Sequence, residues 1–142
     1  MASFSAHDGA DDGAAAPPRK RAALLIAHGS RRDEANRDLV QVAHALRSRA
    51  IVPIVEIAYL ELAEPTILQA GEACVAKGAT SVCLLPYFLS AGRHAAEDLE
   101  ALRRRLAERF PQVTFALAPP LSPHPLLIDI LVERLGNGLP NG

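Results

Sequence analysis

Apolar residues form four short runs along the chain, at residues 22–27, 51–59, 81–86 and 113–118. Within each run most apolar residues follow one another instead of alternating with polar ones. This pattern is typical of strands that are buried on both faces of a parallel sheet. The chain is therefore expected to contain four buried strands.

Between and after these runs, apolar residues recur every three or four positions, as on one face of an amphipathic helix. The clearest such helix ends at Pro111, and its apolar face consists of Leu99, Leu102, Leu106 and Phe110. The preceding helix is bounded by Pro65, which suits a first turn, and Gly78, which suits a C-terminal stop. A last helix is expected from about residue 125 to residue 135, with an inward face formed by Leu127, Ile130 and Leu131.

The order of strand followed by helix, repeated four times, predicts an α/β fold. The expected architecture is a small doubly wound parallel sheet of about four strands with helices on both faces. Ligands of such sheets bind beyond the carboxyl ends of the strands. The loops at that edge are residues 27–33, 59–65, 86–94 and 118–125, and functional residues are expected there.

The length of 142 residues fits one domain, since a domain typically has about 100–200 residues. Residues 1–20 are rich in Ala, Gly, Ser and Asp, and such a segment buries too little apolar surface to offset chain entropy. They are expected to form a disordered tail. The folded domain is then expected over residues 21–136, followed by a flexible tail at residues 137–142.

Charge and composition exclude several classes of function. The formal net charge is −1 and aromatic residues make up 4%, so neither a broad nucleic-acid surface nor a base-stacking platform is expected. No apolar run approaches the ~20 residues that span a bilayer, and the N-terminal segment is acidic where a secretory signal is basic. A cytoplasmic location without membrane contact is expected, with Cys74 and Cys83 as buried or half-buried free thiols.

Two histidines and a glutamate follow three of the expected strands. His28 comes directly after the first strand, Glu61 directly after the second, and His94 ends the loop after the third. All three then project from the same edge of the sheet. Two imidazoles and a carboxylate are suitable ligands for a first-row divalent metal, and three protein ligands leave positions open for a substrate. The competing interpretations are a histidine base and an ordinary hydrogen-bonded histidine at a strand end.

Groups that can bind anions lie beside these residues. Ser30 and Arg31 stand at the start of the first helix, where free N–H groups and the helix dipole favour anions, and Ser90 and Arg93 flank the second histidine. Alternatively, Ser30 or Asp33 caps the helix and the arginines are solvated. His124 follows the fourth strand at the same edge, where it either orients a substrate or belongs to a turn.

Three motifs carry these residues: I-A-H-G-S-R-R, A-Y-L-E-L-A-E-P and L-L-P-Y-F-L-S-A-G-R-H, one after each of the first three strands. In combination they resemble the small class II chelatases of the CbiX/SirB type, over about residues 22–135. The resemblance implies insertion of cobalt or iron, with nickel in an archaeal branch, into sirohydrochlorin for cobalamin or siroheme biosynthesis. It also implies that His28, Glu61 and His94 are the metal-site and catalytic residues.

The resemblance further implies how the reaction proceeds. The macrocycle lies over the site and receives the metal from the histidines as the pyrrole N–H protons leave. No cofactor is implied beyond the divalent metal substrate, Co2+, Fe2+ or Ni2+, and the many carboxylates of the macrocycle suit Ser30, Arg31, Ser90 and Arg93. Short members of the family pair to mimic two-domain forms, so a homodimer is expected, also because a four-stranded unit exposes much surface per residue.

Other functions compete for the same residues. A non-catalytic carrier of metal or tetrapyrrole would keep the same ligands. A hydrolase would need a phosphate-holding arginine before His28, where the chain has Ala27, or a G-x-S-x-G nucleophile elbow, which the sequence lacks. A flavodoxin-like signalling module would need an acidic pocket or a phosphate loop after the first strand, and H-G-S-R is neither. The chelatase interpretation is therefore favoured.

Overall fold

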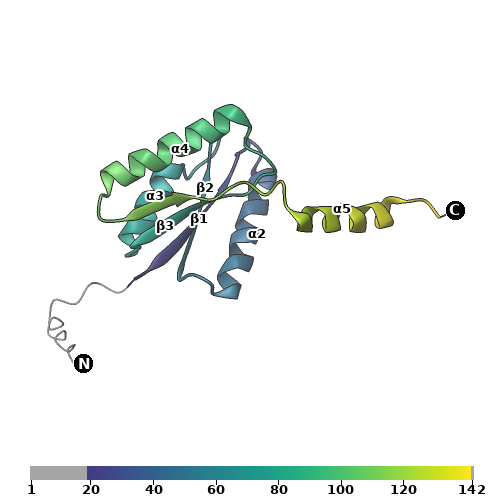
Figure 1. Cartoon of the computed structure of the whole chain (residues 1–142), viewed down its shortest axis with the longest axis horizontal. Helices are drawn as coiled ribbons and strands as arrows, with labels where there is room; N and C mark the ends of the chain where they lie inside the picture. The colour runs from purple at the N-terminus through teal and green to yellow at the C-terminus, as the bar shows by residue number, and fades with distance from the viewer. Residues whose placement is uncertain (1–18, 142) are drawn as a thin grey trace, which may run out of the picture.

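The structure, a computed structural model, describes residues 19–141, and at its centre lies a four-stranded parallel sheet (Figure 1). The strands are β1 (Arg21–Ala27), β2 (Ile54–Tyr59), β3 (Ser81–Pro86) and β4 (Thr114–Leu117), in the order β2-β1-β3-β4. The predicted fold class and the four strands are confirmed. The second strand begins later than expected, because residues 51–53 form bends before the chain pairs with β1.

Four helices alternate with the strands: α2 (Asp33–Arg49), α3 (Ile67–Ala76), α4 (Gly92–Arg109) and α5 (Pro125–Gly138). α2 packs on β1 and β2 from one side of the sheet, whereas α3 and α4 cover the other side. Helices therefore lie on both faces, as predicted. Within residues 19–141, no helix is both long enough and apolar enough to cross a membrane.

α3 begins at a capping box. The Thr66 hydroxyl accepts a hydrogen bond from the Gln69 N–H at 3.2 Å, and the Gln69 side chain accepts one from the Thr66 N–H at 2.8 Å. Pro65 precedes this cap, so the prediction that it occupies the first turn is wrong. Gly78 follows the last residues of the helix with a φ of 96° and confirms the expected stop.

The larger core lies between the sheet and the α3–α4 layer. Leu24 of β1, Leu84 of β3 and Leu106 of α4 have no exposed surface there. α4 approaches α3 closely at Gly71, where a Cβ would lie 2.7 Å from a methyl group of Leu106. This face of the sheet is sealed by two helices in contact with each other.

The smaller core lies under α2 and covers only half of the opposite face. Leu25 and Val55 from the sheet meet Leu39 and Ala43 from α2 there, and all four are buried. α2 lies over β2 and β1, and within residues 19–141 no helix covers this side of β3 and β4 to a comparable extent.

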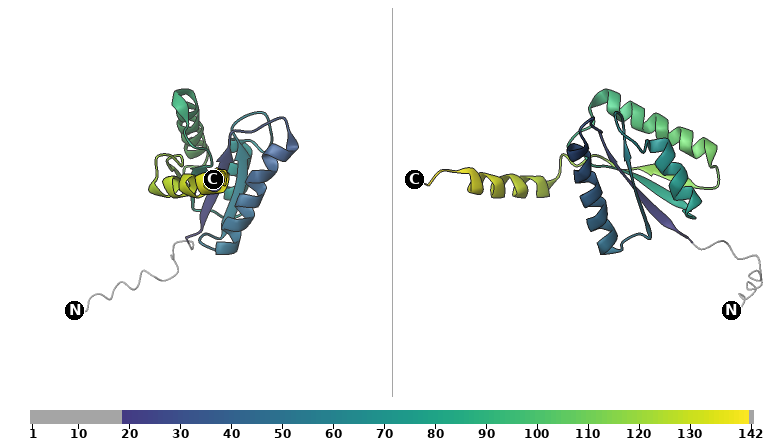
Figure 2. Two further views of the ribbon diagram at one scale, coloured as in Figure 1. Left: turned by 90° about the vertical axis from the view of Figure 1, so that its right-hand side faces the viewer. Right: turned by 180° about the vertical axis from the view of Figure 1, so that it is seen from behind.

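α5 projects from the body, as Figure 1 and the right-hand view of Figure 2 show. None of its residues is buried, and Ile130 and Leu131 are 45% and 63% exposed. The prediction that Leu127, Ile130 and Leu131 face inward is therefore wrong for this chain on its own. Helical spacing specifies an apolar face, but it does not specify the surface that covers it.

The structure describes residues at both predicted boundaries between the domain and its tails. Residues 1–18 lie outside the described range, but the Lys20 N–H donates a hydrogen bond to the Thr80 hydroxyl at 2.8 Å. The body thus already includes Lys20, which was predicted to belong to the N-terminal tail. α5 runs to Gly138, so the predicted C-terminal tail at residues 137–142 begins inside a helix.

Candidate functional site

The central position of β1 places His28 between two neighbouring loops. The N–H of Glu61, just after β2, donates to the His28 carbonyl at 2.9 Å. On the other side, the Tyr87 N–H, just after β3, donates to the Ile26 carbonyl at 2.6 Å. Two backbone connections thus hold the first histidine beside the predicted glutamate and beside the loop that leads to the second histidine.

Gly29 permits the contact between the first two loops. Its φ is 100°, a conformation that side chains disfavour, and an added Cβ would lie 1.8 Å from the Glu61 carbonyl oxygen. Only a residue without a side chain can stand at this point. The glycine of the H-G-S-R motif therefore sets the distance between the backbones that carry His28 and Glu61.

A small cavity of about 250 Å³ opens beside this junction. It is bounded by residues 27–30, by the first turns of α2 and by Tyr87 and Phe88. The exposed ring of His28 lies against Phe88, with the ring centroids 4.4 Å apart and the planes inclined by 31°. The aromatic contact orients the imidazole at the mouth of the cavity.

Asn36 braces the loop that carries His28 and Ser30. Its side-chain oxygen accepts from the Ser30 N–H at 3.0 Å, and its amide donates to the Ser30 carbonyl at 2.8 Å. Its own carbonyl accepts from the Tyr59 hydroxyl at 2.9 Å. Asn36 was not predicted to have a role, since the only signal for it in the sequence is that it is a polar residue at the start of α2, close to the motif.

Tyr87 forms a second polar link across the cavity. Its hydroxyl donates to the Asp38 carboxylate at 3.3 Å. Burial raises the pKa of Tyr87, and the neighbouring Asp38 carboxylate raises it further. The phenol therefore stays protonated and can keep donating at physiological pH. Neither residue was predicted to have a role.

Glu61 and His94 are both exposed at the same edge of the sheet. The sequence predicted that His94 ends a loop. This is wrong, because His94 is the third residue of α4 and lies in the first turn of that helix. Among residues 19–141, no three His, Cys, Asp or Glu side chains form a group that could hold a metal. The structure joins the backbones around His28 and Glu61, but it does not assemble the three predicted ligands into a closed set.

The predicted anion-binding groups differ in their surroundings. The Ser30 hydroxyl accepts from the Arg32 N–H at 3.0 Å in a turn before α2, whose N-cap residue, Arg32, makes no side-chain cap. Neither Ser30 nor Asp33, which is the first residue of α2, is therefore the helix cap. Arg31 and Ser90 are exposed, and Arg93 lies 3.7 Å from Glu97 with its side chain 87% exposed.

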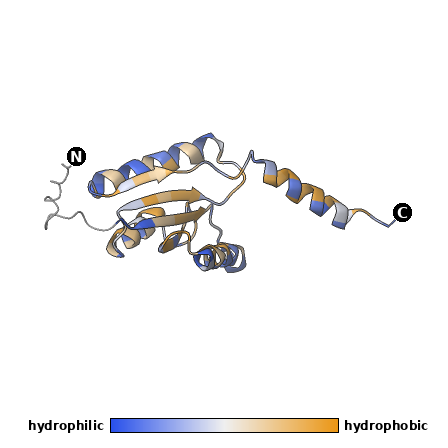
Figure 3. Cartoon of the chain, turned by 60° about the horizontal axis from the view of Figure 1, so that its bottom comes forward, coloured by the Kyte–Doolittle hydropathy of each residue, from blue (hydrophilic) through white to orange (hydrophobic). Residues whose placement is uncertain are grey.

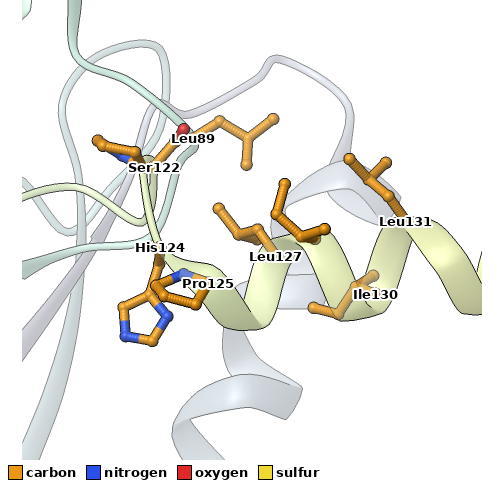
Figure 4. Close-up of a pocket in the computed structure, with 9 residues that line it drawn as sticks. Leu89, Ser122, His124, Pro125, Leu127, Ile130 and Leu131 are labelled. Atoms are coloured by element: carbon orange, nitrogen blue, oxygen red, sulfur yellow. The ribbon is translucent and has the colours of Figure 1, made fainter.

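His124 is the N-cap of α5. Its Nδ1 accepts a hydrogen bond from the Leu126 N–H at 3.1 Å, so His124 has the local structural role that was the alternative to orienting a substrate. Beside it, a hollow of about 760 Å³ lies between Leu89 and the apolar side of α5 (Figure 4). The lining of this hollow is almost entirely apolar, unlike that of the cavity at His28.

Comparisons with known proteins agree over most of the chain. The CbiX family model matches residues 22–137. The chain is 38% identical to the chloroplastic sirohydrochlorin ferrochelatase of Arabidopsis thaliana over 112 residues, which are 79% of this chain and 50% of that protein.

Solved structures give the same picture. The sirohydrochlorin chelatase SirB from Bacillus subtilis subspecies spizizenii, in complex with cobalt, is similar with a TM-score of 0.78 and 30% identity, over 84% of this chain and 51% of SirB. A CbiX protein from Marinobacter aquaeolei VT8, ascribed to cobalamin (vitamin B12) biosynthesis, has a TM-score of 0.69 and 30% identity, over 83% of this chain and 99% of that one. This chain thus spans about half the length of the plant protein and of SirB.

Proposed function

The chain belongs to the CbiX family, and on this premise we propose that it inserts a divalent metal, cobalt or iron, into sirohydrochlorin. One observation carries the proposal most directly. Gly29 lets the backbones of His28 and Glu61 meet beside an open cavity, at the sheet edge where ligands of such folds bind. Similar proteins have names that refer to this chemistry, with iron in the plant relative and cobalt in SirB.

His28, Glu61 and His94 are the proposed metal ligands. Two imidazoles and a carboxylate bind a first-row ion and leave coordination positions free for the pyrrole nitrogens. Because Glu61 and His94 are exposed, their side chains can turn towards a metal at His28 without uncovering buried surface. The same three residues are the proposed catalytic groups, since an imidazole or a carboxylate can accept the protons that leave the pyrroles.

The carboxylates of the macrocycle would be bound by Ser30, Arg31, Ser90 and Arg93. Arg31 and Ser90 are exposed, and the ion pair between Arg93 and Glu97 is too open to solvent to hold the guanidinium firmly. The first turn of α2 adds N–H groups and the positive end of the helix dipole. The ring would thus be held around its edge while its centre faces His28.

Pairing of two chains would supply the second half of the larger relatives. The chain covers about half of SirB and nearly all of the Marinobacter protein, so a homodimer is the proposed functional unit. We also place the reaction in the cytoplasm, where the free thiols of Cys74 and Cys83 would stay reduced.

The test is metal insertion by the purified protein. Sirohydrochlorin is mixed with Co2+, Fe2+ or Ni2+, since a site of two histidines and one glutamate accepts all three, and the absorbance of the macrocycle is followed. We expect insertion well above the spontaneous rate with cobalt or iron. No acceleration with any of the three metals would refute the chelatase assignment and leave a non-catalytic carrier as the alternative.

Single substitutions test the assigned residues. His28→Ala and His94→Ala should each abolish most of the activity, and Glu61→Gln should reduce it strongly while keeping the shape of the side chain. His44→Ala is the matched control, because His44 is exposed on α2 and is not one of the residues that line the cavity. Full activity in both histidine variants would refute the site assignment without refuting the reaction.

A further inference from the structure

His28 combines a well-fixed backbone with an exposed side chain. Next to it, Gly29 lies against the Glu61 carbonyl. On the following residue, the Asn36 side chain holds both backbone groups of Ser30, at 3.0 and 2.8 Å. These contacts position the backbone of His28, but they do not restrict the rotation of its imidazole. An exposed side chain can occupy several staggered rotamers, and a metal site uses only those that direct a ring nitrogen at the ion.

One contact reaches the imidazole ring itself. The Phe88 ring lies against it, with the ring centroids 4.4 Å apart and the planes inclined by 31°. This separation is close to the lower end of the range for attractive aromatic pairs, about 4.5–7 Å. Phe88 contacts the face of the imidazole, whereas the lone pairs of the ring nitrogens lie in the imidazole plane. The contact therefore limits the rotation of the His28 ring without engaging either nitrogen.

Phe88 is the better fixed of the two rings. The strands of the sheet are mainly apolar (Figure 3), and Phe88, two residues after β3, is half-buried against the larger core. Its carbonyl accepts from the Leu121 N–H at 3.1 Å. The preceding residue, Tyr87, donates through its N–H to Ile26 at 2.6 Å and through its hydroxyl to Asp38 at 3.3 Å. An anchored ring thus restricts an exposed one.

We propose that Phe88 is a positioning residue whose ring holds the His28 imidazole in the rotamer that binds the metal. This inference rests on the proposed function, because it takes His28 as a metal ligand. Metal-binding histidines are commonly oriented by a hydrogen bond at the second ring nitrogen, and here the stacked ring provides the orientation. Apparent affinity falls with the fraction of molecules in the binding-competent state, so loss of this contact should weaken metal binding roughly two- to tenfold.

Phe88→Leu tests this role, because it removes the ring and keeps an apolar side chain. Phe110→Leu is the matched control. Phe110 is also half-buried and has an aromatic neighbour, Phe115, at 6.4 Å, but it lies at the C-terminal end of α4, away from the candidate site. Circular dichroism verifies the fold of each variant. Phe88→Met, which also lacks the ring and is more flexible, replaces Phe88→Leu if that variant does not fold.

Nuclear magnetic resonance of the imidazole protons measures the contact in the absence of metal. Protons that lie over the face of an aromatic ring are shifted upfield. The His28 signals, identified by their loss in His28→Ala, should lie upfield in the wild type and in Phe110→Leu. They should move downfield, to the position of a free imidazole, in Phe88→Leu. Unchanged signals in Phe88→Leu would overturn the proposal, whatever the result for metal insertion.

Co2+ binding and kinetics measure the consequence of the contact. Phe88→Leu should raise the Kd for Co2+ roughly two- to tenfold over the wild type and Phe110→Leu, and His28→Ala should raise it further. During metal insertion the loss should fall on the KM for Co2+, and saturating Co2+ should restore kcat, because the bound metal then fixes the ring. A merely structural defect would instead lower kcat through the amount of folded protein and leave the KM unchanged.

The outcomes separate the role of Phe88 from the proposed function. Equal or tighter Co2+ binding by Phe88→Leu, together with weaker binding by His28→Ala, would overturn the positioning role and leave the metal site intact. Unchanged binding by His28→Ala would refute the ligand assignment and the positioning role with it. If both measurements give the expected results but the wild type does not insert metal, only the chelatase reaction is refuted.

Discussion

α4 and α5 have the same kind of amphipathic pattern and opposite fates in the folded chain. Leu99 and Leu106 of α4 are 2% and 0% exposed, whereas Leu131 and Leu135 of α5 are 63% and 60% exposed. The difference lies in what each helix meets: α4 contacts β4 and α3, while α5 leaves the sheet at its edge (Figure 2). Apolar spacing therefore shows that a helix needs a partner, and only the tertiary structure shows which partner is available.

The largest effect should come from the covered helix. Leu106→Ala removes a fully buried side chain that fills the space between α3 and α4, and it should lower the free energy of unfolding by about 3 kcal/mol. Guanidinium denaturation followed by circular dichroism measures this loss. Leu126→Ala is the matched change on the polar side of α5, where the side chain is 62% exposed, and it should cost less than about 0.5 kcal/mol. Similar losses in the two variants would mean that α5 belongs to the same cooperative core.

The next largest effect is expected at Gly29, where two backbones, and not two helices, approach each other closely. Gly29→Ala would force a methyl group against the Glu61 carbonyl at a positive φ, and should cost about 2–3 kcal/mol. It should also reduce metal insertion, because the backbones that carry His28 and Glu61 must separate. Gly92→Ala is the control: its φ of 68° is also positive, but an added Cβ meets nothing within 4 Å, so only about 1 kcal/mol is expected. Equal costs would show that the contact with Glu61 is not what requires glycine.

Most of the fold could be predicted because its strands are short apolar runs that are buried on both faces. Such runs can be recognised from a few neighbouring residues, and the alternation of strands with helices leaves few possible topologies. The inward face of α5 could not be predicted correctly, because helical spacing specifies an apolar face but not the surface that covers it, and within residues 19–141 no residue of α5 is buried. The start of α4 was also missed: Ala91 caps it without a side-chain hydrogen bond, so no capping residue marks the position.

The candidate site could be predicted in part for similar reasons. His28 and Glu61 follow adjacent strands, and the hydrogen bond between their backbones is the geometry that strand ends of a parallel sheet produce. Asn36 was not found, because its role depends on a side chain that reaches back to the backbone of Ser30. Whether His94 joins His28 and Glu61 around a metal stays a prediction, to be tested by the variants described above.

A smaller effect is expected from removing the N-terminal caps of α3 and α5. Thr66→Ala removes the side-chain cap of α3, which packs in the core, and should lower the free energy of unfolding by about 1 kcal/mol. His124→Ala removes the cap of α5, whose Nδ1 accepts from the Leu126 N–H. Because α5 is not part of the body, this change should fray the helix without shifting the denaturation midpoint. A shift as large as that of Thr66→Ala would contradict the independence of α5.

The smallest effect isolates the helix propensity of α5 from everything that could cover it. Gly136→Ala adds a methyl group where no other atom lies within 4 Å, so it relieves the cost of glycine in a helix without any clash. The gain is about 0.5–1 kcal/mol for the helix alone, which corresponds to roughly two- to fivefold slower amide exchange along α5. The change should be measured by hydrogen exchange in a Leu131→Glu background, where a charge on the exposed apolar face of α5 keeps other molecules from protecting the helix. The denaturation midpoint should not move, because the stability of the body does not depend on α5. If the denaturation midpoint rises together with the protection from exchange, then α5 folds cooperatively with the sheet, as α4 does, and the two helices differ only in how strongly they are coupled to it.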